Sequence, residues 1–169
     1  YNKILATNPA DNMDVRYRRA SVLLYKLPTT PPPWDNRAEL EVASKDIQMI
    51  LDSQALPKNS TLGKIYQMRG SIALGLEDYE GALESYNKAL ELGESFDSIN
   101  SLVEQVKEKQ RDSLKKEKIS SLLNNHDIPL RIASRAHQTL ASLYYKEKDL
   151  EKALREYEAT LECLLKVDI

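Results

Sequence analysis

Residues 63–95 read GKIYQMRGSIALGLEDYEGALESYNKALELGES, and this stretch decides the fold. Side chains that recur every three or four residues lie on one face of a helix, and the stretch contains two such sets: Tyr66, Gly70 and Ala73, then Ala82, Tyr86 and Ala89. Asp78 and Tyr79 lie between the sets at a turn. Small residues allow two antiparallel helices to approach closely, and tyrosines fill the gaps beside them. The stretch therefore predicts a hairpin of two packed helices.

A second copy of this order runs from Ser134 to the end of the chain. Its members are His137, Leu140, Ala141 and Tyr144, then Lys148 and Asp149 at the turn, then Ala153, Tyr157 and Thr160. Ala141 takes the place of Gly70, and Thr160 takes the place of Ala89. Self-similarity at a fixed order of small and aromatic residues indicates a repeat architecture.

Both copies resemble the tetratricopeptide repeat, whose pattern is an aromatic, a Gly, a second packing residue, a turn, an Ala, another aromatic and another Ala. The resemblance implies an all-α fold, a right-handed α-solenoid of antiparallel helix pairs. The departures are a Pro-rich insertion, the absence of Pro after Leu92, and Arg19 and Arg69 where the pattern has Leu.

The remaining segments are consistent with the same pattern, so we predict a single repeat domain over residues 1–169. We expect the end of a preceding repeat at 1–12, a repeat at 13–56 with a Pro-rich insertion at 28–36, the best-conforming repeat at 62–95, a long or degenerate helical segment at 97–125, and a last repeat at 130–168. Tyr1, Lys3, Ile4, Leu5 and Pro9 fit the end of a second helix, so the chain is expected to begin in mid-repeat and to be a piece of a longer protein.

The composition of the chain excludes several classes of function. The 169 residues are 41% hydrophobic and 30% charged with a net charge of −2, which gives no global field for nucleic acid or an anionic membrane. No stretch approaches the roughly 20 apolar residues of a membrane span. Cys163 is the only cysteine, which excludes an internal disulfide and favours a reducing compartment. We expect an intracellular, cytoplasmic protein, with the nucleus as the alternative.

The sequence lacks the signs of an enzyme. His126 falls in a predicted loop and His137 in an aromatic packing position, and neither has metal-ligand spacing to Cys, Asp or Glu. The five glycines form no phosphate-binding loop. We expect no catalytic residues, no metal and no cofactor.

The resemblance also implies a binding surface, because the first helices of successive repeats line a concave groove. The residues at groove positions are Tyr17, Ser21, Leu24, Tyr25, Lys64, Gln67, Ser71, Leu74, Arg135, Gln138, Ser142, Tyr145 and Lys146. Tyrosines, amides and a few cations suit an extended or helical segment of another protein, so we expect a scaffold or adaptor. For Tyr17, Tyr25 and Tyr145, packing between helices is an equal alternative, and the cations are more often simply solvated.

Three alternatives stay open. A co-chaperone would grip the acidic C-terminal tail of a heat-shock chaperone with a carboxylate clamp; Lys64 fits one clamp lysine, whereas Arg18 and Met68 stand where Asn and Arg are expected, with Arg69 as a substitute. An RNA- or membrane-associated repeat would have basic residues along one whole face, and Arg16, Arg18 and Arg19 form a local basic cluster that is a weak nucleic-acid signal among mixed charges. The Pro-rich segment 29–34 could instead be presented to an aromatic groove. Independently, the apolar end at Leu161, Leu164, Leu165 and Val167 predicts further packing against more chain or a partner.

Overall fold

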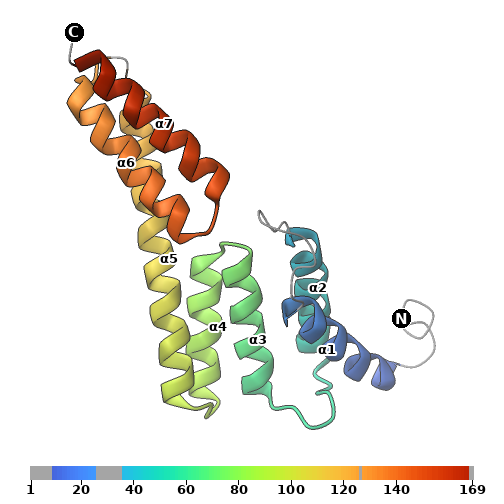
Figure 1. The fold of residues 1–169 in the computed structure, drawn as a ribbon. Helices are drawn as coiled ribbons and strands as arrows, with labels where there is room; N and C mark the ends of the chain where they lie inside the picture. Colours follow the sequence, from blue (N-terminus) through green and yellow to red (C-terminus); the bar gives the residue numbers. More distant parts are fainter. Residues whose placement is uncertain (1–8, 26–35, 126, 168–169) are drawn as a thin grey trace. The chain divides into compact units, whose positions relative to one another are not determined.

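The computed structural model of the chain describes residues 9–25, 36–125 and 127–167, without the side chains of residues 9–12, 25 and 167. Within those ranges the chain forms seven α-helices and no strand (Figure 1). They are α1 (Pro9–Tyr25), α2 (Arg37–Ser53), α3 (Leu62–Gly75), α4 (Tyr79–Glu91), α5 (Phe96–Leu123), α6 (Leu130–Lys146) and α7 (Leu150–Val167). The predicted all-α helical-repeat fold class is confirmed.

The helices divide into two compact units. The first unit contains α1 to α4 and α5 as far as Glu108, and the second contains the rest of α5 with α6 and α7. The division falls inside α5. This helix has 28 residues and covers most of the segment 97–125, which is expected to be long or degenerate.

The first core of unit one joins α1, α2 and α3. Ala43, Ile47 and Ile50 follow each other at helical spacing on α2 and are at most 1% exposed. They pack with apolar side chains of all three helices, namely Met13, Ala20, Leu40, Ile65, Met68 and Ile72. Fully burying such a side chain stabilises the fold by about 1.5–3 kcal/mol, so this apolar stripe fixes which face of α2 turns inward.

A buried ion cluster fastens α1 to α2 beside this core. The carboxylate of Asp46 is 1% exposed and accepts hydrogen bonds from Arg16 at 2.9 Å and from Arg19 at 2.6 Å. The hydrogen bond to Asp46 raises the pKa of Arg19. A buried carboxylate needs such pairing, because leaving it alone would cost several kcal/mol.

The second core of unit one joins α3, α4 and the first half of α5. Its buried members are Ala73, Ala82, Tyr86, Ala89, Ile99 and Val106. A Cβ atom added at Gly70 would lie 2.6 Å from Cε1 of Tyr86, so only glycine allows the tyrosine ring to lie against α3. Thr61 and Asp78 cap the two helices, because their side chains accept hydrogen bonds from the backbone N–H groups of Lys64 and Gly81.

Unit two is built in the same way from α6 and α7. The small residues Ala133, Ala136, Ala141 and Ala153 are buried between the helices together with Leu140. Asp149 accepts a hydrogen bond from the backbone N–H of Lys152 at 3.1 Å, as expected for a helix start. The two hairpins therefore share their small-residue contacts and the aspartate that precedes their second helix.

One end of a helix differs from the expectation. Pro9 is expected after a helix, but the structure places it at the first residue of α1, where its missing N–H costs nothing. Tyr1, Lys3, Ile4 and Leu5, the Pro-rich segment with Trp34, and His126 lie outside the described residues.

Candidate protein-binding surface

The outward face of α6 gathers the predicted groove residues of the last repeat. Ala133, Ala136 and Leu140 face inward, which turns the opposite side of the helix to solvent. The exposed side carries Arg131, Arg135, Gln138, Ser142, Tyr145 and Lys146. Five of these six are the residues expected from the sequence, and together they form what we call the α6 face.

A hollow of about 590 Å³ lies at one end of the α6 face. It is lined by Arg131, Ile132, Ser134, Arg135 and Gln138 of α6 and by Thr160 and Leu164 of α7. Among the described residues, no carboxylate forms an ion pair with Arg131 or Arg135. The hollow therefore offers two guanidinium groups one helical turn apart, an amide and two apolar side chains.

Sequence reasoning missed part of this hollow. Arg131 lies four residues before Arg135, so an extension of the helical face by one turn would have found it. Thr160 and Leu164 carried no such signal, because they come from α7 and join the hollow only through the packing of the hairpin.

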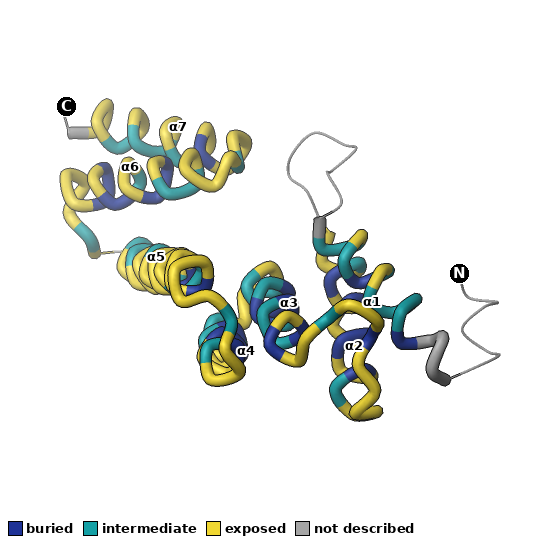
Figure 2. The backbone as a smooth tube through the Cα atoms, turned by 90° about the horizontal axis from the view of Figure 1, so that it is seen from below, coloured by how far each residue is buried: buried dark blue, intermediate teal, exposed yellow. Residues whose placement is uncertain are grey.

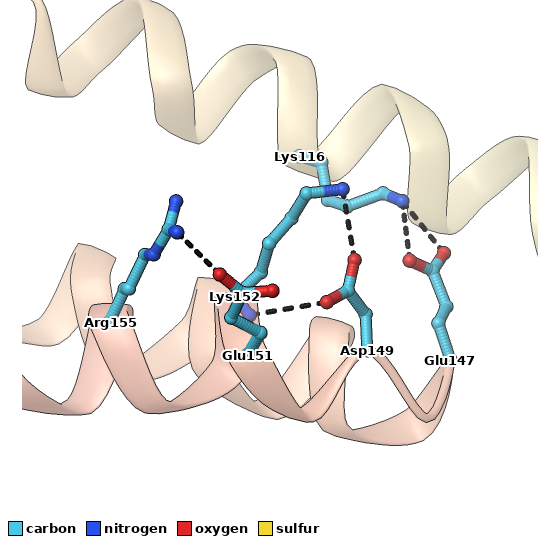
Figure 3. Close-up of polar contacts among 6 residues, drawn as sticks. All are labelled: Lys116, Glu147, Asp149, Glu151, Lys152 and Arg155. Atoms are coloured by element: carbon cyan, nitrogen blue, oxygen red, sulfur yellow. Dashed lines mark hydrogen bonds and ion pairs between the residues drawn. The ribbon is translucent and has the colours of Figure 1, made fainter. Parts of the chain in front are cut away.

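A polar network in unit two anchors the turn between α6 and α7 to α5. The ammonium of Lys116 donates to both carboxylate oxygens of Glu147 at 2.7 and 2.8 Å, and Lys152 pairs with Asp149 at 2.9 Å (Figure 3). Lys116 and Lys152 each place their ammonium 5.5 Å from the centre of the Tyr144 ring. This geometry suits a cation–π contact and holds the hairpin at a defined place on α5.

Lys146 belongs to the same network. Its ammonium donates to Asp112 of α5 at 2.7 Å, and this hydrogen bond lowers the pKa of Asp112. The hydrogen bond from Lys152 likewise lowers the pKa of Asp149. Of the predicted cations of α6, Lys146 is therefore occupied within the fold, whereas Arg135 is directed to the hollow.

The predicted residues of α3 lie deeper than those of α6. Lys64 is exposed, whereas Gln67, Ser71 and Leu74 are half-buried. The hydroxyl of Ser71 lies 3.0 Å from that of Tyr86, and Leu74 packs against the second core. Ser71 and Leu74 therefore contribute to packing, and a binding role for all four residues stays a prediction.

The predicted residues of α1 are also half-buried. Tyr17 and Leu24 pack against the first core, and Ser21 is half-buried beside them. The side chain of Tyr25 lies outside the described part of the chain. A groove role for these residues stays a prediction.

Several of the residues on which the alternative functions depend are buried or paired within the fold. Arg16 and Arg19 are engaged with Asp46, so Arg18 is the only exposed member of the basic cluster. Met68, at the position of the clamp arginine, is 7% exposed within the first core. Arg69 lines a small hollow of about 380 Å³ together with Glu84, Lys88 and Glu91, where carboxylates already balance the cations.

Comparison with known protein families identifies one family in the sequence of these hairpins. A model of the tetratricopeptide repeat matches residues 63–94 and 134–162, which are the α3–α4 and α6–α7 hairpins. The chain contains tetratricopeptide repeats. Comparison with curated proteins and with solved structures gave no match. Tetratricopeptide repeats typically mediate protein–protein interactions and are not catalytic, so the exposed faces of these hairpins are the first surfaces to consider for binding.

Among the described residues, two features that would indicate other kinds of site are absent. None of the described helices combines the length and apolar character needed to cross a bilayer. Within the described ranges, no three His, Cys, Asp or Glu side chains gather where they could hold a metal ion.

Proposed function

We propose that this protein is a scaffold or adaptor that holds a segment of a partner protein along the α6 face. The observation that carries the proposal is the hollow beside Arg131 and Arg135, which combines two guanidinium groups that pair with no carboxylate of the described residues with the apolar side chains of Ile132 and Leu164. Exposed arginines beside apolar side chains are enriched at protein interfaces.

The chemistry of the hollow describes the segment that it would hold. A guanidinium binds a carboxylate through two parallel N–H···O bonds, so Arg131 and Arg135 favour an Asp, a Glu or a chain terminus. Ile132 and Leu164 would receive a neighbouring apolar side chain, and Gln138 and Tyr145 could contact the backbone of an extended peptide. We expect no catalytic step and no cofactor, and a cytoplasmic location with the nucleus as the alternative.

The same arginines keep the co-chaperone alternative open, since an acidic chain terminus is one form of such a segment. At the position of the clamp arginine the chain has Met68, which is buried. In this alternative, Arg131 and Arg135 of the α6 face would hold the acidic tail.

Peptide binding tests this function. Two fluorescent peptides of the same sequence, with acidic and leucine residues, would be titrated into the protein, one with a free C-terminal carboxylate and one amidated. We expect both to bind, with an affinity about 10-fold weaker for the double variant Arg131→Glu, Arg135→Glu, since two charge-assisted contacts become repulsive.

A matched control removes cations that the structure places elsewhere. The variant Lys107→Glu, Lys118→Glu changes charge equally but on exposed positions of α5, and it should bind as the parent does. Equal loss in both variants would mean that net charge, not the α6 face, controls binding. Binding of the free-carboxylate peptide alone would favour the co-chaperone alternative over a general scaffold.

A further inference from the structure

An apolar stripe along α7 is exposed to solvent. Leucines and one tyrosine follow each other at alternating spacings of four and three residues, which places them on one side of the helix. Their exposed fractions are 59% for Leu150, 59% for Leu154, 41% for Tyr157, 60% for Leu161 and 46% for Leu164. Figure 2 shows exposed positions recurring along α7. No described residue covers this stripe, which is the α7 stripe below.

The equivalent stripe in the other repeat is covered. The two repeats align at a fixed offset that pairs Ala82 with Ala153, so the α7 stripe corresponds to Tyr79, Leu83, Tyr86 and Leu90 of α4. These residues pack with Ile99, Leu102, Val103 and Val106 on the first half of α5. The packing of α4 against α5 therefore shows which kind of helix such a stripe packs with: one that carries apolar residues at i, i+3, i+4 and i+7.

Charges beside the α7 stripe restrict what kind of helix fits. Glu151 and Glu158, two turns apart, lie along its outer flank, with Glu162 one turn further on. Glu151 pairs with Arg155 of its own helix at 2.5 Å. Glu158 and Glu162 are exposed and have no partner among the described residues. A helix on this stripe would therefore gain from cations at the positions facing Glu158 and Glu162.

We propose that the α7 stripe docks an amphipathic helix of a partner protein, with apolar residues at the spacing of α5 and with Lys or Arg on one flank. This surface shares Leu164 with the hollow beside the α6 face and otherwise consists of different residues. A second copy of the chain fits less well, because the cation on the acidic flank of its own α7, Arg155, is already paired with Glu151, and the flank of Ala153 and Thr160 carries none.

Two designed helical peptides test the proposal. Both carry leucine and isoleucine at the spacing of residues 99–106, and their flanking positions are Lys in one and Glu in the other. Anisotropy titrations against the parent protein should give about 10-fold tighter binding of the Lys peptide. The variant Glu158→Lys, Glu162→Lys should reverse this preference, and Leu154→Ser, Leu161→Ser should abolish binding of both peptides.

Two control variants test whether peptide binding is specific to the α7 stripe. Val22→Ser, Met49→Ser removes two apolar side chains of comparable exposure, 64% and 45%, from the first unit and should leave peptide binding unchanged. Arg131→Glu, Arg135→Glu should also leave it unchanged, which separates this proposal from the function proposed for the α6 face. Circular dichroism confirms that each variant is folded.

Other outcomes would overturn the proposal. Absence of peptide binding to the parent would mean that the α7 stripe is not a docking site for such a helix. Equal binding of the Lys and Glu peptides, unchanged in the charge variant, would show that the acidic flank does not select the partner. A dimer in analytical ultracentrifugation that Leu154→Ser, Leu161→Ser dissociates would identify a second copy as the occupant.

Discussion

The α3–α4 and α6–α7 hairpins have the same internal design but differ in what surrounds them. In both, small residues bring the two helices together, and an aromatic follows four residues after the alanine of the second helix. Tyr86 of α4 is fully buried beneath α5, whereas its equivalent, Tyr157 of α7, is 41% exposed. The repeat pattern thus specifies a hairpin, and the neighbouring helix decides whether the same aromatic position belongs to the core or to the surface.

The first helices of the two hairpins differ in a similar way. On α3, Ser71 reaches the hydroxyl of Tyr86 and Leu74 enters the second core. Their equivalents on α6, Ser142 and Tyr145, are exposed. The contacts of α3 with α4 and with the second core therefore use side chains whose equivalents in the second hairpin are left available for binding.

The largest expected difference comes from removing the two equivalent aromatic side chains, Tyr86 and Tyr157. Tyr86→Ala should lower the free energy of unfolding by about 3–5 kcal/mol, because a buried ring leaves a cavity. Tyr157→Ala should cost about 1 kcal/mol or less, since much of its ring already contacts water. Urea unfolding followed by circular dichroism measures both.

Tyr86→Phe is the control for this pair of substitutions. It keeps the ring and removes only the hydroxyl contact with Ser71, so a loss of about 1 kcal/mol is expected. Equal losses for the two alanine variants would contradict the comparison, because they would mean that Tyr157 is as well covered as Tyr86.

Sequence reasoning found the hairpins because their signals are local. Gly70 and Ala82, or Ala141 and Ala153, lie within a dozen residues of each other and are spaced as helix contacts require. The pairing of Arg16 and Arg19 with Asp46 could not be read in the same way, because about thirty residues separate the partners. The three arginines therefore suggested a basic surface, whereas two of them serve the core.

The next effect in size comes from exchanging glycine and alanine at the equivalent positions 70 and 141 of the two hairpins. Gly70→Ala should destabilise the protein by about 1–3 kcal/mol, since the added Cβ would lie 2.6 Å from the Tyr86 ring. Ala141→Gly should cost only about 1 kcal/mol, chiefly through lower helix propensity. Thermal unfolding of the two variants beside the parent measures the difference.

A gain in stability for Gly70→Ala would contradict this packing argument. Glycine within a helix is unfavourable by itself, so the substitution has a favourable term of about 1 kcal/mol that the clash must exceed. Combining Gly70→Ala with Tyr86→Phe gives a further check, because the ring remains and the penalty should persist.

The binding surface was predicted less completely than the fold. Exposure of Arg135, Gln138 and Tyr145 followed from the repeat register, since residues on the side opposite Ala133 and Leu140 must face solvent. The occupation of Lys146 by Asp112 did not follow, because it depends on how the hairpin meets α5. The half-burial of the α3 positions likewise depends on neighbouring helices rather than on α3 itself.

The smallest expected effect is a difference between the two hairpins in how much stability they lose in acid. Lysine hydrogen bonds lower the pKa values of Asp112 and Asp149 below their ordinary value of 3.8. Carboxylates with lowered pKa values stabilise the folded state above the unfolded pKa, and this contribution is lost as the pH falls through the folded value. Acidification below about pH 4 should therefore loosen the α6–α7 hairpin by about 1 kcal/mol or less, given solvent screening.

Hydrogen exchange resolved by mass spectrometry at pH 5 and pH 3, corrected for the intrinsic exchange rate, can locate this effect. Peptides from α6 and α7 should lose protection relative to peptides from α3, and the variant Asp112→Asn, Asp149→Asn should show a smaller change with pH because both titrating groups are gone. A uniform loss of protection over both hairpins would instead place the acid sensitivity in carboxylates that the repeats share. In that case the lysine network around Tyr144 would contribute to the position of the hairpin on α5 but not to its response to acid.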